Sequence, residues 1–303
     1  MTGQGRKDHV DARAVALLLG CCLLWGVNQS AMKLALAEIP PLTQSALRSG
    51  GAALLLWAWS VARGIPLWRR DGTAGAGLVA GLLFAVEFGC MFWGLQHTTA
   101  SRMVVFIYLA PFVVAAGMPL ISRSERLDAV QLAGLVLAFG GVVWAFAEGL
   151  GTATGSRQWL GDALGIAAAV LWGATTLVLR ATKLATAAPE KTLLYQLAVS
   201  ALALAAAAVA VGESWPASVS LRSWLALGFQ TVIVTFASYL VWFWLVRHYP
   251  ATRISAFTLL TPVFGLLGGV LLLGEPVTLR LVVALVAVSC GIALVNRLGR
   301  SAR

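Results

Sequence analysis

Two ionisable side chains stand inside long apolar runs of this sequence, where charged groups are costly and usually face a cavity or a partner. Glu87 lies near the centre of LLFAVEFGCMFWG, where it could exchange a coupled proton or bind a substrate amine. Arg48 lies about six residues into another apolar run, where it could hold a substrate carboxylate. The plainer interpretations are an ion pair of Glu87 with Arg48 or Arg102, exposure of Glu87 to a water-filled cavity, and snorkelling of Arg48 to the outer surface.

A tryptophan followed by hydrogen-bonding side chains recurs with helical spacing on two other segments. At i, i+3, i+4 and i+7, which share one helix face, the residues are Trp25, Asn28, Gln29 and Met32 in the first segment and Trp172, Thr175, Thr176 and Leu179 in the second. This pattern suits a cavity for a small molecule with an apolar part. Packing or interface anchoring is the alternative, although the near-central tryptophans argue against an interface belt.

Further candidates come from the segments that contain mid-helix prolines. Pro111 and Pro262 free a backbone carbonyl and predict either paired hinges or simple kinks. The other cavity candidates are Tyr108, Tyr239, Trp242 and Thr258. Charges at helix ends are interpreted as gating or ion-pair groups, or as residues that snorkel to the interface, and these are Lys33, Arg102, Arg180 and Arg253.

Motifs for catalysis or metal binding are not found in the sequence. It has no Walker lysine loop, no zinc helix motif and no nucleophile elbow, and its three histidines lie at chain ends or in loops. The four cysteines lie inside apolar runs without metal-ligand spacing, which favours simple packing. We therefore expect neither an enzyme nor a metal site.

The composition indicates which environment must hold these residues. Hydrophobic residues make up 59% of the 303 and charged residues 11%, with a mean hydropathy of +0.86. Soluble domains carry roughly 25% charged residues. The net charge of +10 comes from basic residues in short connections between apolar runs. That distribution is typical of membrane topology rather than of a nucleic-acid surface.

A membrane-spanning helix needs about 20 mostly apolar residues. This rule predicts ten helices, at about 13–37, 42–63, 74–96, 99–121, 127–148, 158–181, 191–212, 222–246, 251–273 and 276–296. If the N-terminus is cytoplasmic, most basic loop residues lie inside, and the outer ones are Arg102, Arg157, Arg222 and Arg280. We therefore expect both termini in the cytoplasm.

The chain repeats itself at long range. HTTASRMVVFIYLAP at 97–111 matches HYPATRISAFTLLTP at 248–262, and LLWGVNQSAMK at 23–33 matches VLWGATTLVLR at 170–180. Because five predicted helices separate equivalent points, the copies face opposite sides of the membrane. The expected fold is an all-α membrane protein with two inverted five-helix repeats, 1–150 and 151–303. Inverted repeats are typical of secondary transporters, and a structural duplication without a transport role is the alternative.

The early LLWG helix, the end of each half (Pro111 followed by SERL, Pro262 followed by GEPV) and the five-plus-five plan resemble the drug/metabolite transporter superfamily, specifically EamA-type exporters. Among its members, the sequence most resembles bacterial amino-acid and metabolite exporters of the YddG kind. The resemblance covers about residues 13–296 and implies a ten-helix inverted-repeat fold without an ATPase or a covalent cofactor.

From the resemblance and the cavity candidates we expect a secondary transporter that exports amino acids, aromatic or other apolar ones included, or related small metabolites by alternating access. The alternative is a multidrug or quaternary-cation exporter that depends on Glu87 near aromatic rings. A membrane enzyme or signalling subunit is disfavoured because the loops are too short. We expect a small-molecule substrate, a bacterial inner-membrane location in the lipid bilayer, no nucleic acid, and a monomer or weak homodimer.

Overall fold

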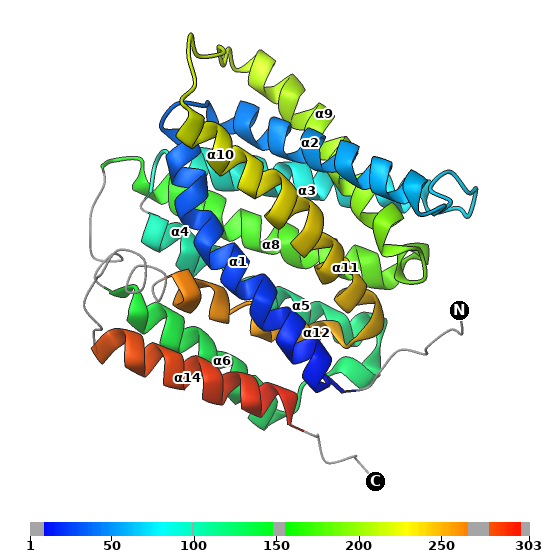
Figure 1. Ribbon diagram of the computed structural model, residues 1–303. Helices are drawn as coiled ribbons and strands as arrows, with labels where there is room; N and C mark the ends of the chain where they lie inside the picture. The colour runs from blue at the N-terminus through cyan, green and yellow to red at the C-terminus, as the bar shows by residue number, and fades with distance from the viewer. Residues whose placement is uncertain (1–8, 99, 148–154, 266–278, 298–303) are drawn as a thin grey trace.

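The computed structural model describes residues 9–98, 100–147, 155–265 and 279–297, and helices are the only regular structure in these ranges. Lipid offers the backbone no hydrogen-bond partner, so apolar runs of this length must fold as helices. In chain order they are α1 (Ala12–Leu36), α2 (Pro41–Ala62), α3 (Ala74–Gly94), α4 (Ala100–Ile107), α5 (Ala110–Ile121), η1 (Arg123–Glu125), α6 (Ala129–Ala145), α8 (Gln158–Ala181), η2 (Lys183–Ala185), α9 (Pro189–Ala210), α10 (Leu221–Phe229), η3 (Gln230–Ser238), α11 (Tyr239–His248), α12 (Ala251–Phe257) and α14 (Leu279–Asn296) (Figure 1).

Several of these helices have the length and composition of membrane spans. Four are long and apolar enough to cross a membrane, namely α3, α8, α9 and the continuous segment Leu221–His248. Shorter apolar stretches cover Ala12–Asn28, Val105–Ile121, Ala129–Ala145 and Val282–Asn296. This is the helix content of a multi-pass membrane protein.

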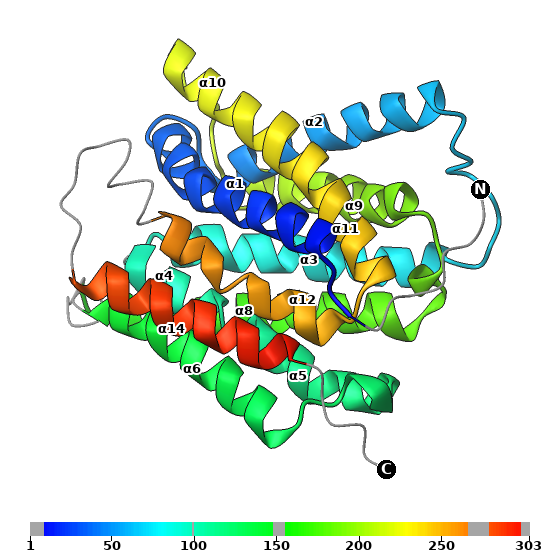
Figure 2. The same ribbon diagram turned by 60° about the horizontal axis from the view of Figure 1, so that its bottom comes forward.

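The helices form one bundle with paired helices at opposite ends. Helices α6 and α14 pack along each other at the bottom of the view in Figure 1, while α2 and α9 pack together at the top. Between these pairs, α3 packs on α8 and α9, and α1 packs on α10 and η3 (Figures 1 and 2). The centre of the bundle is therefore surrounded by α1, α3, α8 and the Leu221–His248 segment.

The helix expected at 99–121 is interrupted. It consists of α4 and α5, which are separated by a turn at Tyr108 and Leu109. Pro111 has no N–H to bond the carbonyl four residues earlier, which releases the backbone there. The Leu109 N–H bonds the Phe106 carbonyl at 3.1 Å, three residues back rather than four. The expectation of an uninterrupted helix was wrong at this turn.

The helix expected at 251–273 is interrupted in the same way. Helix α12 ends before a turn at Thr258 and Leu259, and the chain is helical again up to residue 265, with the remainder outside the described residues. Pro262 cannot donate to the Thr258 carbonyl, which accepts the Thr261 N–H at 2.9 Å instead, and the Thr258 N–H bonds the Ser255 carbonyl at 3.1 Å. In both segments the break lies about one turn before the proline.

The expected helix at 222–246 is continuous, but its middle is not α-helical. Residues Gln230–Ser238 form a π-helix between α10 and α11. Long π-helical stretches are rare, and π geometry in helices is frequently found at functional sites. This segment faces α1 and α2, next to the centre of the bundle.

A polar clamp joins the connection between α2 and α3 to the start of α9. The Lys191 ammonium donates to both carboxylate oxygens of Asp71, at 2.9 and 2.8 Å, and to the Arg69 carbonyl at 2.6 Å. The hydrogen bonds from Lys191 and Thr73 hold the pKa of the Asp71 carboxyl well below its usual range. The clamp fixes one end of α9 against the α2–α3 connection.

Candidate functional site

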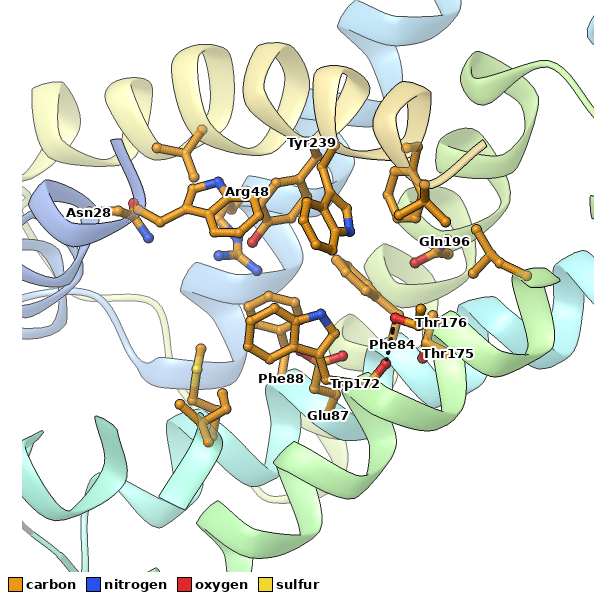
Figure 3. A pocket seen from close by; sticks show the side chains of 18 of the residues that line it. Asn28, Arg48, Phe84, Glu87, Phe88, Trp172, Thr175, Thr176, Gln196 and Tyr239 are labelled. Carbon is orange, nitrogen blue, oxygen red and sulfur yellow. Dashed lines mark hydrogen bonds between the residues drawn. The ribbon is translucent and has the colours of Figure 1, made fainter. Parts of the chain in front are cut away.

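A cavity of about 100 Å³ lies at the centre of the bundle, among α1, α2, α3, α8, α9 and the Leu221–His248 segment (Figure 3). It is smaller than the 300–1,000 Å³ of typical ligand sites, so a substrate of ordinary size requires the surrounding helices to separate. Ten residues expected from the sequence to lie near a substrate line it, namely Trp25, Asn28, Arg48, Glu87, Tyr108, Trp172, Thr175, Thr176, Tyr239 and Trp242.

Aromatic rings from both halves of the chain form one wall of the cavity. Trp25 is the centre of this cluster, with ring centroids 6.5 Å from Trp172, 5.9 Å from Tyr239 and 5.4 Å from Trp242, all edge to face. The Trp25 indole N–H donates to the Ser238 hydroxyl at 2.8 Å, at the end of the π-helix. Because its polar atom is bonded away from the cavity, Trp25 presents an apolar ring to a ligand.

Arg48 is completely buried, with 0% of its surface exposed, so it does not snorkel to the membrane surface. Its guanidinium carbon lies 4.0 Å from the centroid of the Phe88 ring, a cation–π contact. None of its three guanidinium nitrogens has a hydrogen-bond partner among the described residues. Tyr239 and Glu87 act on it electrostatically, but the Tyr239 hydroxyl lacks the geometry of a hydrogen bond.

Glu87 faces the same cavity from α3. The positions i−3, i+1 and i+4 around it carry Phe84, Phe88 and Met91, which also line the cavity. Its Oε2 atom is buried without a hydrogen-bond partner among the described residues. Two ion-pair partners for Glu87 were considered from the sequence. Arg48 is not hydrogen-bonded to it, and Arg102 pairs with Asp162 instead.

The remaining polar side chains of the cavity lie at its two sides. Asn28 lies with Arg48 on the side of α1 and α2, while Gln196 lies with Thr175 and Thr176 on the side of α8 and α9 (Figure 3). The Asn28 Oδ1 atom and both amide atoms of Gln196 have no hydrogen-bond partner within the described part of the chain. The cavity therefore presents several buried polar atoms that only a bound molecule or water can satisfy.

The structure places Thr258, Pro111, Pro262 and Arg253 away from the cavity lining. Thr258 is buried at the helix break, where its hydroxyl donates to the Ser255 carbonyl at 2.6 Å. Pro111 and Pro262 are buried in the segments that follow the two breaks. The Arg253 guanidinium lies beside His9, with 3.3 Å between Nη1 and Nδ1. The side chains of Gln29 and Lys33 lie outside the described residues.

Arg102 and Arg180 form ion pairs near opposite ends of α8. Arg102 Nε donates to Asp162 at 3.0 Å near the start of α8, and the Thr98 hydroxyl donates to the same carboxylate at 2.7 Å. Near the other end, Arg180 pairs with Glu125 of η1.

The Arg180 pair connects four elements. Arg180 Nη1 also donates to the Val246 carbonyl of α11 at 2.8 Å, and Glu125 accepts the Thr252 N–H of α12 at 3.2 Å. A second, smaller pocket beside Arg180 shares Leu179, Phe243 and Val246 with the central cavity. These three side chains are therefore the partition between the cavity and this end of the bundle.

Several lining residues were not singled out from the sequence. Gln196 interrupts the apolar run of α9, which is the same signal that identified Glu87. Phe84 lies three residues before Glu87 and could have been found by extending the helical spacing, and Phe88 follows Phe84 at the next i+4 position. Phe243, Val234 and Val246 are apolar residues in an apolar helix, so nothing in their type distinguishes them from lipid-facing neighbours.

A bundle of apolar helices around a central cavity with aromatic and unpaired polar side chains is the architecture of a small-molecule membrane transporter. The model of the EamA-like transporter family matches residues 12–147 and 159–297, and the chain belongs to this family, within the drug/metabolite transporter superfamily. It is thus a transporter.

Named relatives support this assignment, and a solved structure shares the fold. The chain is 27% identical over 296 residues to a Bacillus subtilis protein described as an uncharacterized transporter, YvbV, covering 96% of this chain and 93% of the relative. It is also 27% identical over 290 residues to a probable amino-acid metabolite efflux pump of Escherichia coli, covering 90% and 89%. A crystal structure with 18% sequence identity shares the fold, with a TM-score of 0.80 over 93% of this chain and 96% of the other.

Proposed function

We propose that this protein is a secondary transporter that exports amino acids, aromatic or other apolar ones included, or related small metabolites across the inner membrane. The observation that carries the proposal is the Arg48 guanidinium, which is fully buried, has no hydrogen-bond partner among the described residues and lines an aromatic cavity that also contains Glu87. A zwitterion supplies the carboxylate and the ammonium that these two groups lack, and the aromatic wall accommodates an apolar side chain. The name of the Escherichia coli relative points to the same substrate class.

Transport proceeds by alternating access in this proposal. Two inverted five-helix repeats, 1–150 and 151–303, rock against each other around the central cavity. The backbone breaks before Pro111 and Pro262 serve as the hinges, because a segment that lacks the regular bonds to the carbonyl four residues back bends there at low cost. Both termini face the cytoplasm, the protein works as a monomer or weak homodimer, and transport is either uncoupled or proton-coupled through Glu87.

The direct test is transport by the purified protein in proteoliposomes that are offered a panel of radiolabelled amino acids. We expect saturable movement of apolar and aromatic members of the panel. We also expect them to protect a cysteine placed at Thr176 from maleimide labelling, because Thr176 lines the cavity. If no amino acid moves and none protects the cysteine, the proposed substrate class is wrong.

A quaternary-cation exporter is the second candidate, and Glu87 among Phe84, Phe88 and Trp172 is the observation that favours it. Glu87→Gln separates the two. A quaternary cation has no N–H and depends on the negative charge, so the variant abolishes its transport. A zwitterion's ammonium can still donate to the glutamine carbonyl, so amino-acid transport largely persists. The second candidate is favoured if the parent protein transports the cation but no amino acid, and Glu87→Gln no longer transports the cation.

A further inference from the structure

Gln196 is a polar side chain that the folded protein leaves unpaired. It lies on α9, is 0% exposed and lines the cavity. Neither its amide nitrogen nor its amide oxygen has a hydrogen-bond partner among the described residues. A buried amide without partners costs free energy that an apolar side chain of similar size would avoid. Its presence is therefore best explained by a group that reaches it in the bound state.

The neighbours of Gln196 restrict what that group can be. The hydroxyls of Thr175 and Thr176 donate to the carbonyls of Leu171 and Trp172 in their own helix, at 2.8 and 3.2 Å. With their protons committed, these oxygens offer only lone pairs to the cavity, whereas the Gln196 amide both donates and accepts. A hydroxyl or a primary amide, which donates and accepts, satisfies this side of the cavity. A carboxylate, which only accepts, leaves the threonine oxygens unpaired.

The opposite side of the cavity has the complementary character. Arg48 and Asn28 lie on the side of α1 and α2, and the rings of Trp172 and Tyr239 lie between them and Gln196 (Figure 3). A molecule that satisfies both sides has a charged end, an aromatic or apolar middle and a hydrogen-bonding far end.

We infer that Gln196 is a specificity-determining residue that binds a hydroxyl or amide at the far end of the substrate's side chain. This inference rests on the proposed amino-acid export. Among the standard amino acids, tyrosine has the required form. Phenylalanine lacks the far group, and serine and asparagine lack the apolar middle. A site built to bond a substrate hydroxyl strongly rejects the analogue without it, because its own polar groups then stay buried and unpaired.

The test compares labelled tyrosine and phenylalanine in proteoliposomes containing the parent protein, Gln196→Met or Ser200→Ala. Ser200→Ala is the matched control, since Ser200 lies one turn further along α9, is equally buried and bonds the Leu197 carbonyl at 3.1 Å. We expect the parent to favour tyrosine by about tenfold or more, Gln196→Met to remove that preference, and Ser200→Ala to retain it.

Three outcomes overturn the inference. Equal transport of tyrosine and phenylalanine by the parent protein overturns the inference, whether or not the variants fold. The proposal of amino-acid export is then unaffected. An unchanged preference in Gln196→Met assigns the selection to other residues. If neither amino acid nor any other in the panel moves, the proposed function fails and this inference fails with it. Melting temperatures of the variants in detergent show whether a loss of transport reflects unfolding.

Discussion

Arg48 carries a positive charge at a fully buried position, and none of its guanidinium nitrogens makes a hydrogen bond among the described residues. The face of Phe88 offsets part of the cost of burying this charge, and the rest lowers the stability of the substrate-free protein. Such a cost is retained where a functional site requires it, since residues at functional sites commonly reduce stability. A substitution at Arg48 should therefore reduce transport without reducing the stability of the fold.

We predict that Arg48→Met lowers transport of a carboxylate-bearing substrate by about 30-fold or more, the loss that follows when one partner of a buried charge pair is removed. The melting temperature in detergent should be unchanged or higher, because an unpaired buried charge is gone. Arg63→Met is the matched control, since Arg63 ends the same helix and lies over the Trp59 ring, but is exposed. A variant that melts several degrees lower yet transports normally would make Arg48 a structural residue.

The sequence predicted individual site residues where their type conflicts with an apolar run. Arg48 and Glu87 stand out in this way, and the structure places both at one cavity. The contact between Trp25 and Trp172 joins residues 147 positions apart and depends on how the two segments pack. The unpaired state of Gln196 is likewise a property of its tertiary surroundings, which no local pattern contains.

At the scale of single elements, two glycines let helices approach the segments that follow the backbone breaks. A Cβ atom at Gly26 of α1 would lie 2.8 Å from the Thr261 carbonyl oxygen and from the Gly265 nitrogen. Gly173 of α8 occupies the corresponding place against Val113 and the Ala110 carbonyl in α5. Trp25 and Trp172, which both line the cavity, are thus each followed by a glycine that packs on the segment after a backbone break.

We predict that Gly26→Ala lowers the melting temperature by roughly 3–10 °C, because an added methyl group forces two backbones apart at a cost of about 1–3 kcal/mol. Gly20→Ala is the control in the same helix, since a Cβ there meets nothing within 4 Å. Thermal unfolding in detergent measures both variants. Equal melting temperatures for the two would show that α1 can shift without cost, and the close approach would then not limit stability.

The buried ion pair of Arg180 and Glu125 is a device that can keep one end of the cavity closed. It joins α8 to η1, and through the Val246 carbonyl and the Thr252 N–H it reaches α11 and α12. The partition of Leu179, Phe243 and Val246 lies directly beside it. Separating these elements requires breaking the pair, so we expect the pair to favour the state in which this end is closed.

We predict that Glu125→Gln speeds maleimide labelling of a cysteine at Thr176 by about fivefold or more, the ratio that corresponds to about 1 kcal/mol of bias. The background has the four native cysteines replaced, and the reagent is applied from the Arg180 side. Asp128→Asn is the control because it removes a carboxylate that pairs with Arg297 in an exposed ion pair at the same end. Labelling at the parent rate in Glu125→Gln would assign closure to the apolar partition alone.

The elements themselves were predictable to different degrees. Runs of apolar residues predicted where helices lie because hydropathy and the backbone's need for hydrogen bonds decide this together. The prolines indicated bending. Each break, however, lies about one turn before its proline, at Tyr108 and Thr258, and its position depends on which backbone hydrogen bonds the packed helices keep. The π-helix of Gln230–Ser238 has no sequence signature that we recognise.

At the scale of the whole molecule, the distribution of basic residues predicts which end of the cavity faces which compartment. Basic residues on the α2–α3 connection, such as Arg70, belong to the side predicted to be cytoplasmic, and the connection before α8 at 155–157 belongs to the opposite side. The Arg180–Glu125 pair lies at the end where Asp128 meets Arg297 near the C-terminus. The positive-inside rule therefore predicts that the end of the bundle with this pair faces the cytoplasm.

We predict that in intact cells a membrane-impermeant maleimide labels Ser156→Cys but not Arg70→Cys, in a chain without its native cysteines. Both positions are exposed, so the difference reports the side of the membrane and not burial. Lysis should make both react equally, which controls for reactivity. The reverse pattern would place the Arg180–Glu125 pair outside. If the pair keeps its end closed as predicted above, reversal would also mean that this end is closed to the exterior rather than to the cytoplasm.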